Sequence, residues 1–258
     1  MKSGDVSITY IVISSEVERS QHQGEIMVGL IISVIICVIL SAFFIAVRVC
    51  KGGVYGLLTK TLASLGFVIC GLVAYNWGAT MQFNAGMFIV IGLVLGMIGD
   101  ILLDLKVIYP DDQQTYLNYG MLSFGLGHVA YLVALTILVV NSANVMLIWI
   151  VSIIVSAIMS PLTMFASKKM GLDFGKSYIQ SLIYSFILIF ATVYAIICAF
   201  YVHIIAIFAC ALVLFLASDL VLSLMYFGDK QSDKKLIIIN HALYYIAQIT
   251  IMAFIFVI

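Results

Sequence analysis

The chain of 258 residues is 64% hydrophobic and only 9% charged, with a formal net charge of zero and a mean hydropathy of +1.22. Because this composition leaves too little polar surface to coat a domain of that size, it excludes an ordinary soluble protein and predicts an all-α, polytopic membrane protein whose first partner is the lipid bilayer. No basic tract is present, so nucleic acid is not expected as a partner. The sequence carries no signal for an oligomeric state.

Eight runs are long and apolar enough to cross a membrane, since a helical span needs about 20 mostly apolar residues. Residues 1–25 are more polar and are expected to form a solvent-exposed lead-in, because they lack the apolar core of a signal peptide. The sequence thus predicts a lead-in at 1–25 and an eight-span helical membrane domain at 26–258. In chain order the predicted spans are 26–47, 57–75, 87–105, 118–139, 144–164, 177–198, 203–226 and 236–257.

Lysine and arginine residues gather on one side of the predicted bundle. The loops after spans 1, 3, 5 and 7 carry Arg48, Lys51, Lys106, Lys168, Lys169, Lys176, Lys230, Lys234 and Lys235, and the loops after spans 2, 4 and 6 carry none. Since basic residues near span ends stay on the cytoplasmic side, both termini are predicted to be non-cytoplasmic, although Lys2 and Arg19 in the lead-in favour the opposite orientation. The expected location is a multi-pass position in a membrane, the cell membrane if the source is bacterial.

The stretch "LGMIGDILLD" at 95–104 places two acids inside an apolar span. A charge near the bilayer centre costs roughly 2.5 to 3.5 kcal/mol or more, so Asp100 is expected to have a function or a partner. Gly92, Gly96, Asp100 and Asp104 recur every four residues, and small residues at that spacing predict a helix face that packs inward. Two interpretations of Asp100 are open, a catalytic acid or a structural ion pair with Lys60. Asp104 is expected near the membrane surface, where it can reach water.

Spans 3 and 4 resemble spans 7 and 8. Aligning "LVLGMIGDILLDL" with "LVLFLASDLVLSL" superposes Asp100 on Asp219, and aligning "GHVAYLVALT" with "NHALYYIAQI" superposes His128 on His241 and Tyr131 on Tyr244. An even offset of four spans predicts a parallel 4+4 internal repeat that brings Asp100 and Asp219 to a common cavity. The alternative is chance similarity between apolar helices.

The cysteine and histidine pattern does not favour a metal centre. The five cysteines lie in or beside apolar runs without a CxxC pair, which indicates packing, and the four histidines show no HExxH spacing. No metal is therefore predicted, although two histidines and two aspartates leave an unspecific metal site open.

Five segments together resemble the YhhN-like membrane proteins, a family that includes the lysoplasmalogenases. They are "LLTKTL" around Lys60, "GLVLGMIGDILL", "GMLSFGLGHVAYL", "LFLASDLVLSL" and "LYYIAQ", and the resemblance extends from about residue 55 to the C-terminus. It implies an eight-span helical bundle in which Asp100 and Asp219 occupy the positions of the family's two catalytic aspartates. The residues expected to support them are His128, Lys60, Tyr131, Ser218, His241, Tyr244 and Gln248.

The resemblance implies an ether hydrolase acting on a lysolipid, which splits the vinyl ether of a lysoplasmalogen into a fatty aldehyde and a glycerophospho-base. Two nearby acids suit this reaction, because one can protonate the alkene while the other stabilises the cation or activates water, without a cofactor. Lys60 is expected to meet the substrate phosphate, and His128 to orient an acid or water. The carboxyls of Asp100 and Asp219 are predicted to lie about 4 to 8 Å apart, close to the separation known for glycoside hydrolases.

Two other functions remain open from the sequence. A parallel repeat with acids inside the membrane is equally typical of a proton-coupled small-molecule transporter. The third possibility is a metal-dependent membrane lipid hydrolase that uses aspartate and histidine ligands.

Overall fold

The computed structural model describes residues 4–78, 83–228, 230 and 232–258, with side chains described at 21, 23–77, 84–228, 230 and 232–258. These residues form eight long helices, each long and apolar enough to cross a membrane, and the described part of the chain contains no strand. The predicted fold class is confirmed. The helices are α1 (Gly4–Cys50), α2 (Gly53–Gly78), α3 (Phe83–Ile108), α4 (Gln113–Val139), α5 (Val145–Lys169), α6 (Tyr178–Tyr201), α7 (Ile205–Phe227) and α8 (Lys234–Phe254).

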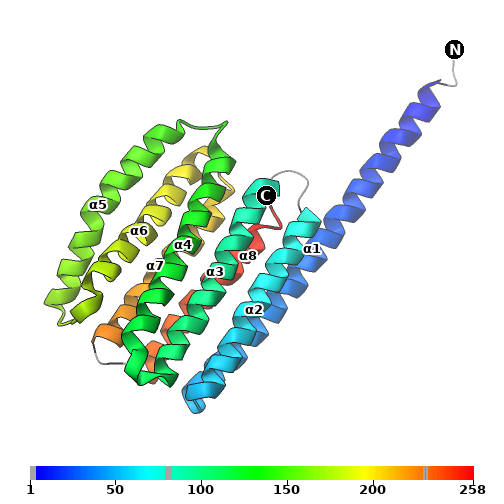
Figure 1. Cartoon of the computed structure of the whole chain (residues 1–258). Coiled ribbons are helices and arrows are strands. Elements are labelled where there is room, and N and C mark those ends of the chain that lie inside the picture. Colours follow the sequence, from blue (N-terminus) through cyan, green and yellow to red (C-terminus); the bar gives the residue numbers. More distant parts are fainter. Residues whose placement is uncertain (1–3, 79–82, 229, 231) are drawn as a thin grey trace.

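The helices pack as an up-and-down bundle with short connections (Figure 1). The odd-numbered helices end, and the even-numbered helices begin, at one end of the bundle, which is the lower end in Figure 1. Basic side chains lie in the last turns of α1, α3 and α5, and Lys176 lies in the short 3₁₀ helix η2 (Gly175–Ser177) before α6. We call this end the basic end. Its predicted cytoplasmic location stays a prediction.

Helix α1 begins at Gly4 and continues without a break into the first span. Its N-terminal part projects beyond the other helices at the end opposite the basic end (Figure 1). The lead-in at 1–25 is predicted to be exposed, but most of its side chains lie outside the described ones. The division into a lead-in and a membrane domain therefore stays a prediction.

Helices α3, α4, α7 and α8 supply the central packing, with α1 and α5 at opposite edges of the bundle (Figure 1). In each half of the chain every helix packs on the one that follows it, and α2 contacts α8 just as α6 contacts α4. The packing of α1 on α8, however, has no counterpart of similar extent between α5 and α4, and the predicted parallel repeat remains a prediction. One 3₁₀ turn, η1 (Pro110–Asp112), joins α3 to α4.

The inward face predicted for α3 is confirmed by its glycines. A Cβ atom added to Gly92 would lie 2.1 Å from a ring carbon of Tyr131, and one added to Gly96 would lie 2.8 Å from the side-chain nitrogen of Gln248. On α4, a Cβ at Gly127 would lie 3.2 Å from the backbone oxygen of Gly92. The absence of side chains at these positions lets α3 and α4 approach closely and so fixes the height of Asp100 in the bundle.

Replacing Gly92 with alanine is expected to lower the free energy of unfolding by about 1 to 3 kcal/mol, because the buried Tyr131 ring has no free space to move into. Thermal unfolding of the purified protein in detergent measures this loss. Gly24→Ala is the matched control, since nothing lies within 4 Å of its added Cβ. Equal unfolding temperatures for the two variants would contradict the close approach of α3 and α4.

Candidate functional site

Asp100 on α3 is almost completely buried, with 2% of its surface exposed, and three side chains contact its carboxylate. The Lys60 ammonium lies 3.0 Å from Oδ1. The Ser64 hydroxyl donates a hydrogen bond to Oδ2 over 2.5 Å, and the Tyr244 hydroxyl donates to the same oxygen over 2.7 Å. Because Lys60 and Ser64 lie four residues apart on α2, one face of that helix supplies two of the three donors.

Lys60 also holds a second acid. Its ammonium lies 3.5 Å from Oδ1 of Asp104, and Arg48 on α1 forms an ion pair with Oδ2 of Asp104. Two cations and two carboxylates therefore form one charge-balanced network across α1, α2 and α3. The expectation that Asp104 reaches water near the surface is wrong: only 4% of it is exposed, because Arg48 and Lys60 neutralise it inside the bundle.

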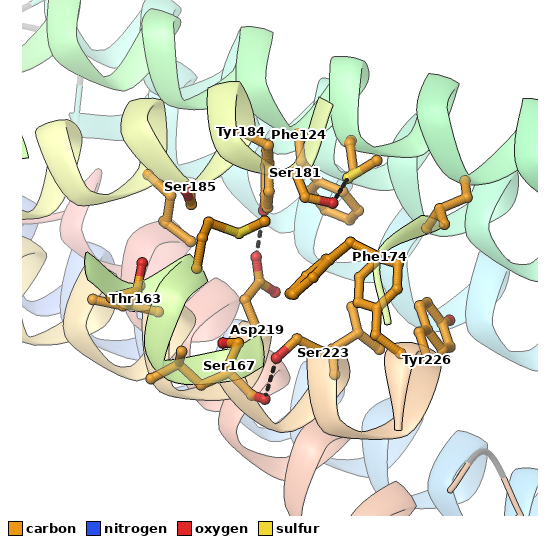
Figure 2. A pocket seen from close by; sticks show the side chains of 18 of the residues that line it. Phe124, Thr163, Ser167, Phe174, Ser181, Tyr184, Ser185, Asp219, Ser223 and Tyr226 are labelled. Carbon is orange, nitrogen blue, oxygen red and sulfur yellow. Dashed lines mark hydrogen bonds between the residues drawn. The ribbon is translucent and has the colours of Figure 1, made fainter. Parts of the chain in front are cut away.

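Asp219 on α7 has a different environment from Asp100. It is only partly buried, and the Tyr184 hydroxyl from α6 donates a hydrogen bond to its Oδ2. Its carboxyl group lies among the side chains of a pocket of about 110 Å³ between α4, α5, α6 and α7 (Figure 2). We call this pocket the chain pocket. Apart from Asp219, its lining residues have apolar, aromatic or small hydroxyl side chains.

The structure places both predicted acids at one cavity. Asp100, Asp219 and Lys60 line a smaller cavity together with Asn240, His241 and Tyr244 from α8. We call it the acid cavity. Asp219 and Phe124 also line the chain pocket, so Asp219 lies at the boundary between the two spaces.

Two of the predicted supporting residues extend the hydrogen bonds around Asp100. Gln248 Nε2 donates to the hydroxyl of Tyr244 over 2.9 Å, and Tyr244 in turn donates to Asp100. His241 lines the acid cavity and packs edge-on against Phe44, with ring centroids 4.8 Å apart. One helix, α8, therefore carries all three of these residues: His241, Tyr244 and Gln248.

Three other predicted residues make no hydrogen bond to the acids in the described structure, and of these only Ser218 lines the acid cavity. The His128 Nδ1 nitrogen lies 2.7 Å from the backbone oxygen of Phe124 and so donates to it, which leaves Nε2 as an acceptor with no partner among the described residues. Tyr131 packs on the His128 ring. Ser218 donates to the backbone oxygen of Asn240 and accepts from the Asn240 side chain, so it joins α7 to α8.

Three residues that contact the acids were not predicted from the sequence: Ser64, Tyr184 and Arg48. Ser64 has a usable signal, because it lies one helical turn beyond Lys60 and so faces the same neighbour. Tyr184 lies in "LIYSF" and Arg48 at the end of α1, where no pattern distinguishes them from packing and loop residues. Within the described residues, no group of three or more His, Cys, Asp or Glu side chains is arranged to hold a metal ion.

Comparison with known proteins gives a family match. The sequence model described as the YhhN family matches residues 55–255, which include Lys60, Ser64, Asp100, Tyr184, Asp219 and Tyr244. No curated protein and no solved structure matches the chain. Arg48 lies outside the matched range.

We expect Lys60→Met to lower the free energy of unfolding by about 3 to 5 kcal/mol, because it leaves Asp100 buried without a cation. Asp100→Asn should cost less, since Lys60 keeps its contact with Asp104. The double variant Lys60→Met, Asp100→Asn should lose less than the sum of the two single changes. Thermal unfolding measures all three, with Lys235→Met at an exposed position as the control. Strictly additive losses would contradict the ion pair.

Proposed function

We propose that this chain, which belongs to the YhhN family, is a membrane-embedded hydrolase that cleaves the vinyl ether of lysoplasmalogen-type lysolipids. The observation that carries the proposal is that two acids from different helices line one cavity, and that this cavity adjoins an apolar pocket. The cavity supplies acid and base groups, and the pocket supplies a place for a hydrocarbon chain.

The two acids differ in a way that divides the chemistry between them. Asp100 faces an ammonium group and two hydroxyl donors, an environment that suits a permanent carboxylate. Asp219 has one neutral donor, Tyr184, and a mostly apolar surrounding, which suits a neutral carboxylic acid. We therefore assign the reactive proton to Asp219.

In the proposed reaction Asp219 transfers its proton to the alkene carbon that lies beta to the ether oxygen. The former double-bond electrons form the new C–H bond, and the adjacent carbon becomes an oxocarbenium ion. The Asp100 carboxylate, fixed by its ion pair, stabilises this cation across the acid cavity. Paired carboxylates divide their work similarly in glycoside hydrolysis.

Water then attacks the cationic carbon and loses a proton to a carboxylate, which gives a hemiacetal. The hemiacetal hydroxyl then gives up its proton to a carboxylate as its oxygen forms the carbonyl, and the bond to the glycerol oxygen breaks. That oxygen takes a proton from the acid pair, which releases the fatty aldehyde and the glycerophospho-base. Over the cycle one water molecule is consumed, and the proton returns to the acid pair. Tyr184 positions Asp219, and Tyr244 and Lys60 position Asp100.

The lining of the chain pocket suits a hydrocarbon chain. Its walls are largely leucine, isoleucine, methionine and phenylalanine side chains, as expected of a site that buries hydrocarbon. Asp219 contributes the only carboxylate among the pocket's lining residues. An apolar chain in this pocket therefore brings its polar end next to the acid.

The test is release of fatty aldehyde from a lysoplasmalogen by the purified protein in lipid nanodiscs. Asp219→Asn and Asp100→Asn should each lower the rate by about 10²- to 10⁴-fold, the usual contribution of a positioned acid or base. Tyr184→Phe keeps the ring but removes the donor to Asp219, so it should lower the turnover rate with a smaller effect on KM.

Asp111→Asn is the matched control, because this carboxylate is exposed in the turn between α3 and α4. No aldehyde from the native protein, or full activity of Asp219→Asn, would contradict the proposal. Proton-driven uptake of a small molecule into liposomes without aldehyde release would instead support a transporter.

A further inference from the structure

Lys106, in the last turn of α3, is a buried lysine that forms no ion pair among the described residues. Only 3% of it is exposed, and its ammonium lies over the ring of Tyr226, 2.8 Å from the ring centroid. Because a buried charge without a counterion is strongly unfavourable, this residue is a candidate to bind an anionic group that comes from outside the protein.

Lys106 lines a mostly polar pocket of about 200 Å³ at the basic end of the bundle, which we call the head pocket. Lys176 from η2 and the amide side chains of Gln113 and Gln114 also line it. The one carboxylate of the head pocket, Asp173, accepts a hydrogen bond from the backbone N–H of Gly175 over 2.9 Å. Two lysines thus outnumber one acid, and that acid is bonded to its own loop.

The head pocket adjoins the chain pocket that contains Asp219. Leu117, Phe174, Tyr226 and Phe227 line both spaces. Figure 2 shows Phe174 and Tyr226 on one side of Asp219, at the part of the chain pocket that borders the head pocket. A single molecule with an anionic head and an apolar chain can therefore occupy both.

From these observations we infer that Lys106 and Lys176 bind the phosphate of the lysolipid head group, while the chain pocket takes its hydrocarbon chain. The inference rests on the proposed function, for which it identifies the residues that recognise the substrate. Lys60 was predicted from the sequence to meet the substrate phosphate. Its charge is already neutralised by Asp100 and Asp104. Lys106, by contrast, is a buried lysine that forms no ion pair among the described residues.

The spacing between the lysine and the acids fits this substrate. Lys106 lies six residues after Asp100 on α3, and Tyr226 lies seven residues after Asp219 on α7. At 1.5 Å per residue these separations are about 9 and 10 Å along the helix axes. Six bonds connect the phosphorus of a lysoplasmalogen to its first alkenyl carbon, and an extended chain of six bonds spans about 7 Å. The length from the phosphate to the alkene is therefore of the same order as the axial separation between Lys106 and the acids.

Binding of uncleavable probes tests the inference without any chemical step. The probes are the saturated alkyl ether analogue of a lysoplasmalogen, the matching alkylglycerol, which lacks the phosphate, and glycerophosphoethanolamine, which lacks the chain. Affinities are measured by isothermal titration calorimetry on the full-length protein in detergent. We expect Lys106→Gln and Lys176→Gln each to weaken binding of the phosphate-bearing lipid about tenfold or more, because each removes a charge-assisted hydrogen bond. Binding of the alkylglycerol should stay unchanged.

Two further variants serve as controls. Lys106→Arg keeps the charge and should retain most of the affinity, and Lys235→Gln removes an exposed lysine at the same end of the bundle and should have no effect. Lys176 is exposed, so its substitution leaves the packing of the bundle intact even if Lys106→Gln lowers stability.

Equal affinity of the native protein for the phosphate-bearing lipid and the alkylglycerol would overturn the inference. Unchanged binding of the phosphate-bearing lipid to both glutamine variants would overturn it as well. If glycerophosphoethanolamine alone binds as tightly as the lipid, the site takes a soluble phosphate ester and the lipid assignment is wrong.

The outcome is separable from that of the proposed function. The expected binding pattern without aldehyde release would contradict the hydrolase but support the phosphate site. Aldehyde release with an unchanged KM in both glutamine variants would support the hydrolase but contradict the phosphate site.

Discussion

The ion-pair network of Arg48, Lys60, Asp100 and Asp104 is the constraint on which the rest of the site depends. Each of these charges alone inside an apolar bundle would cost several kcal/mol. Together they neutralise one another, and the contacts fix α1, α2 and α3 at one relative height. The close approach of α3 and α4 at Gly92 and Gly127 then places Asp100 in the centre of the fold.

Asp219, the second acid, differs from Asp100 because it forms no ion pair among the described residues. Asp219 has a single described donor, Tyr184, and borders a pocket built for hydrocarbon. Two chemically identical side chains therefore meet at one cavity in unequal environments, one held by a cation and one held by a neutral hydroxyl. This inequality is what the proposed mechanism uses, since a proton donor and an anionic stabiliser are needed at the same substrate.

Much of the architecture follows from simple properties of the sequence. The eight spans were predictable because each needs about 20 apolar residues, and the inward face of α3 followed from glycines spaced four apart. The meeting of Asp100 and Asp219 at one cavity followed from the similarity between spans 3 and 7. The partnership of Lys60 with Asp100 was one of two open interpretations.

Other features depend on contacts between distant parts of the chain, which no local pattern records. Asp104 is buried because Arg48, 56 residues earlier, reaches it from another helix. Tyr184 becomes the partner of Asp219 only because α6 packs on α7. In the sequence Lys106 is the lysine of the loop after the third predicted span. Its burial depends on where α7 places Tyr226, because the ammonium lies over that ring.

A structure of the protein with the saturated ether analogue bound tests the central claim most directly. We predict the ether oxygen and the first chain carbons between the carboxyl groups of Asp100 and Asp219, with those groups about 4 to 8 Å apart, close to the separation in hydrolases that pass through an oxocarbenium-like step. A lipid that binds elsewhere, or carboxyl groups more than about 12 Å apart and therefore outside that range, would contradict the paired-acid account.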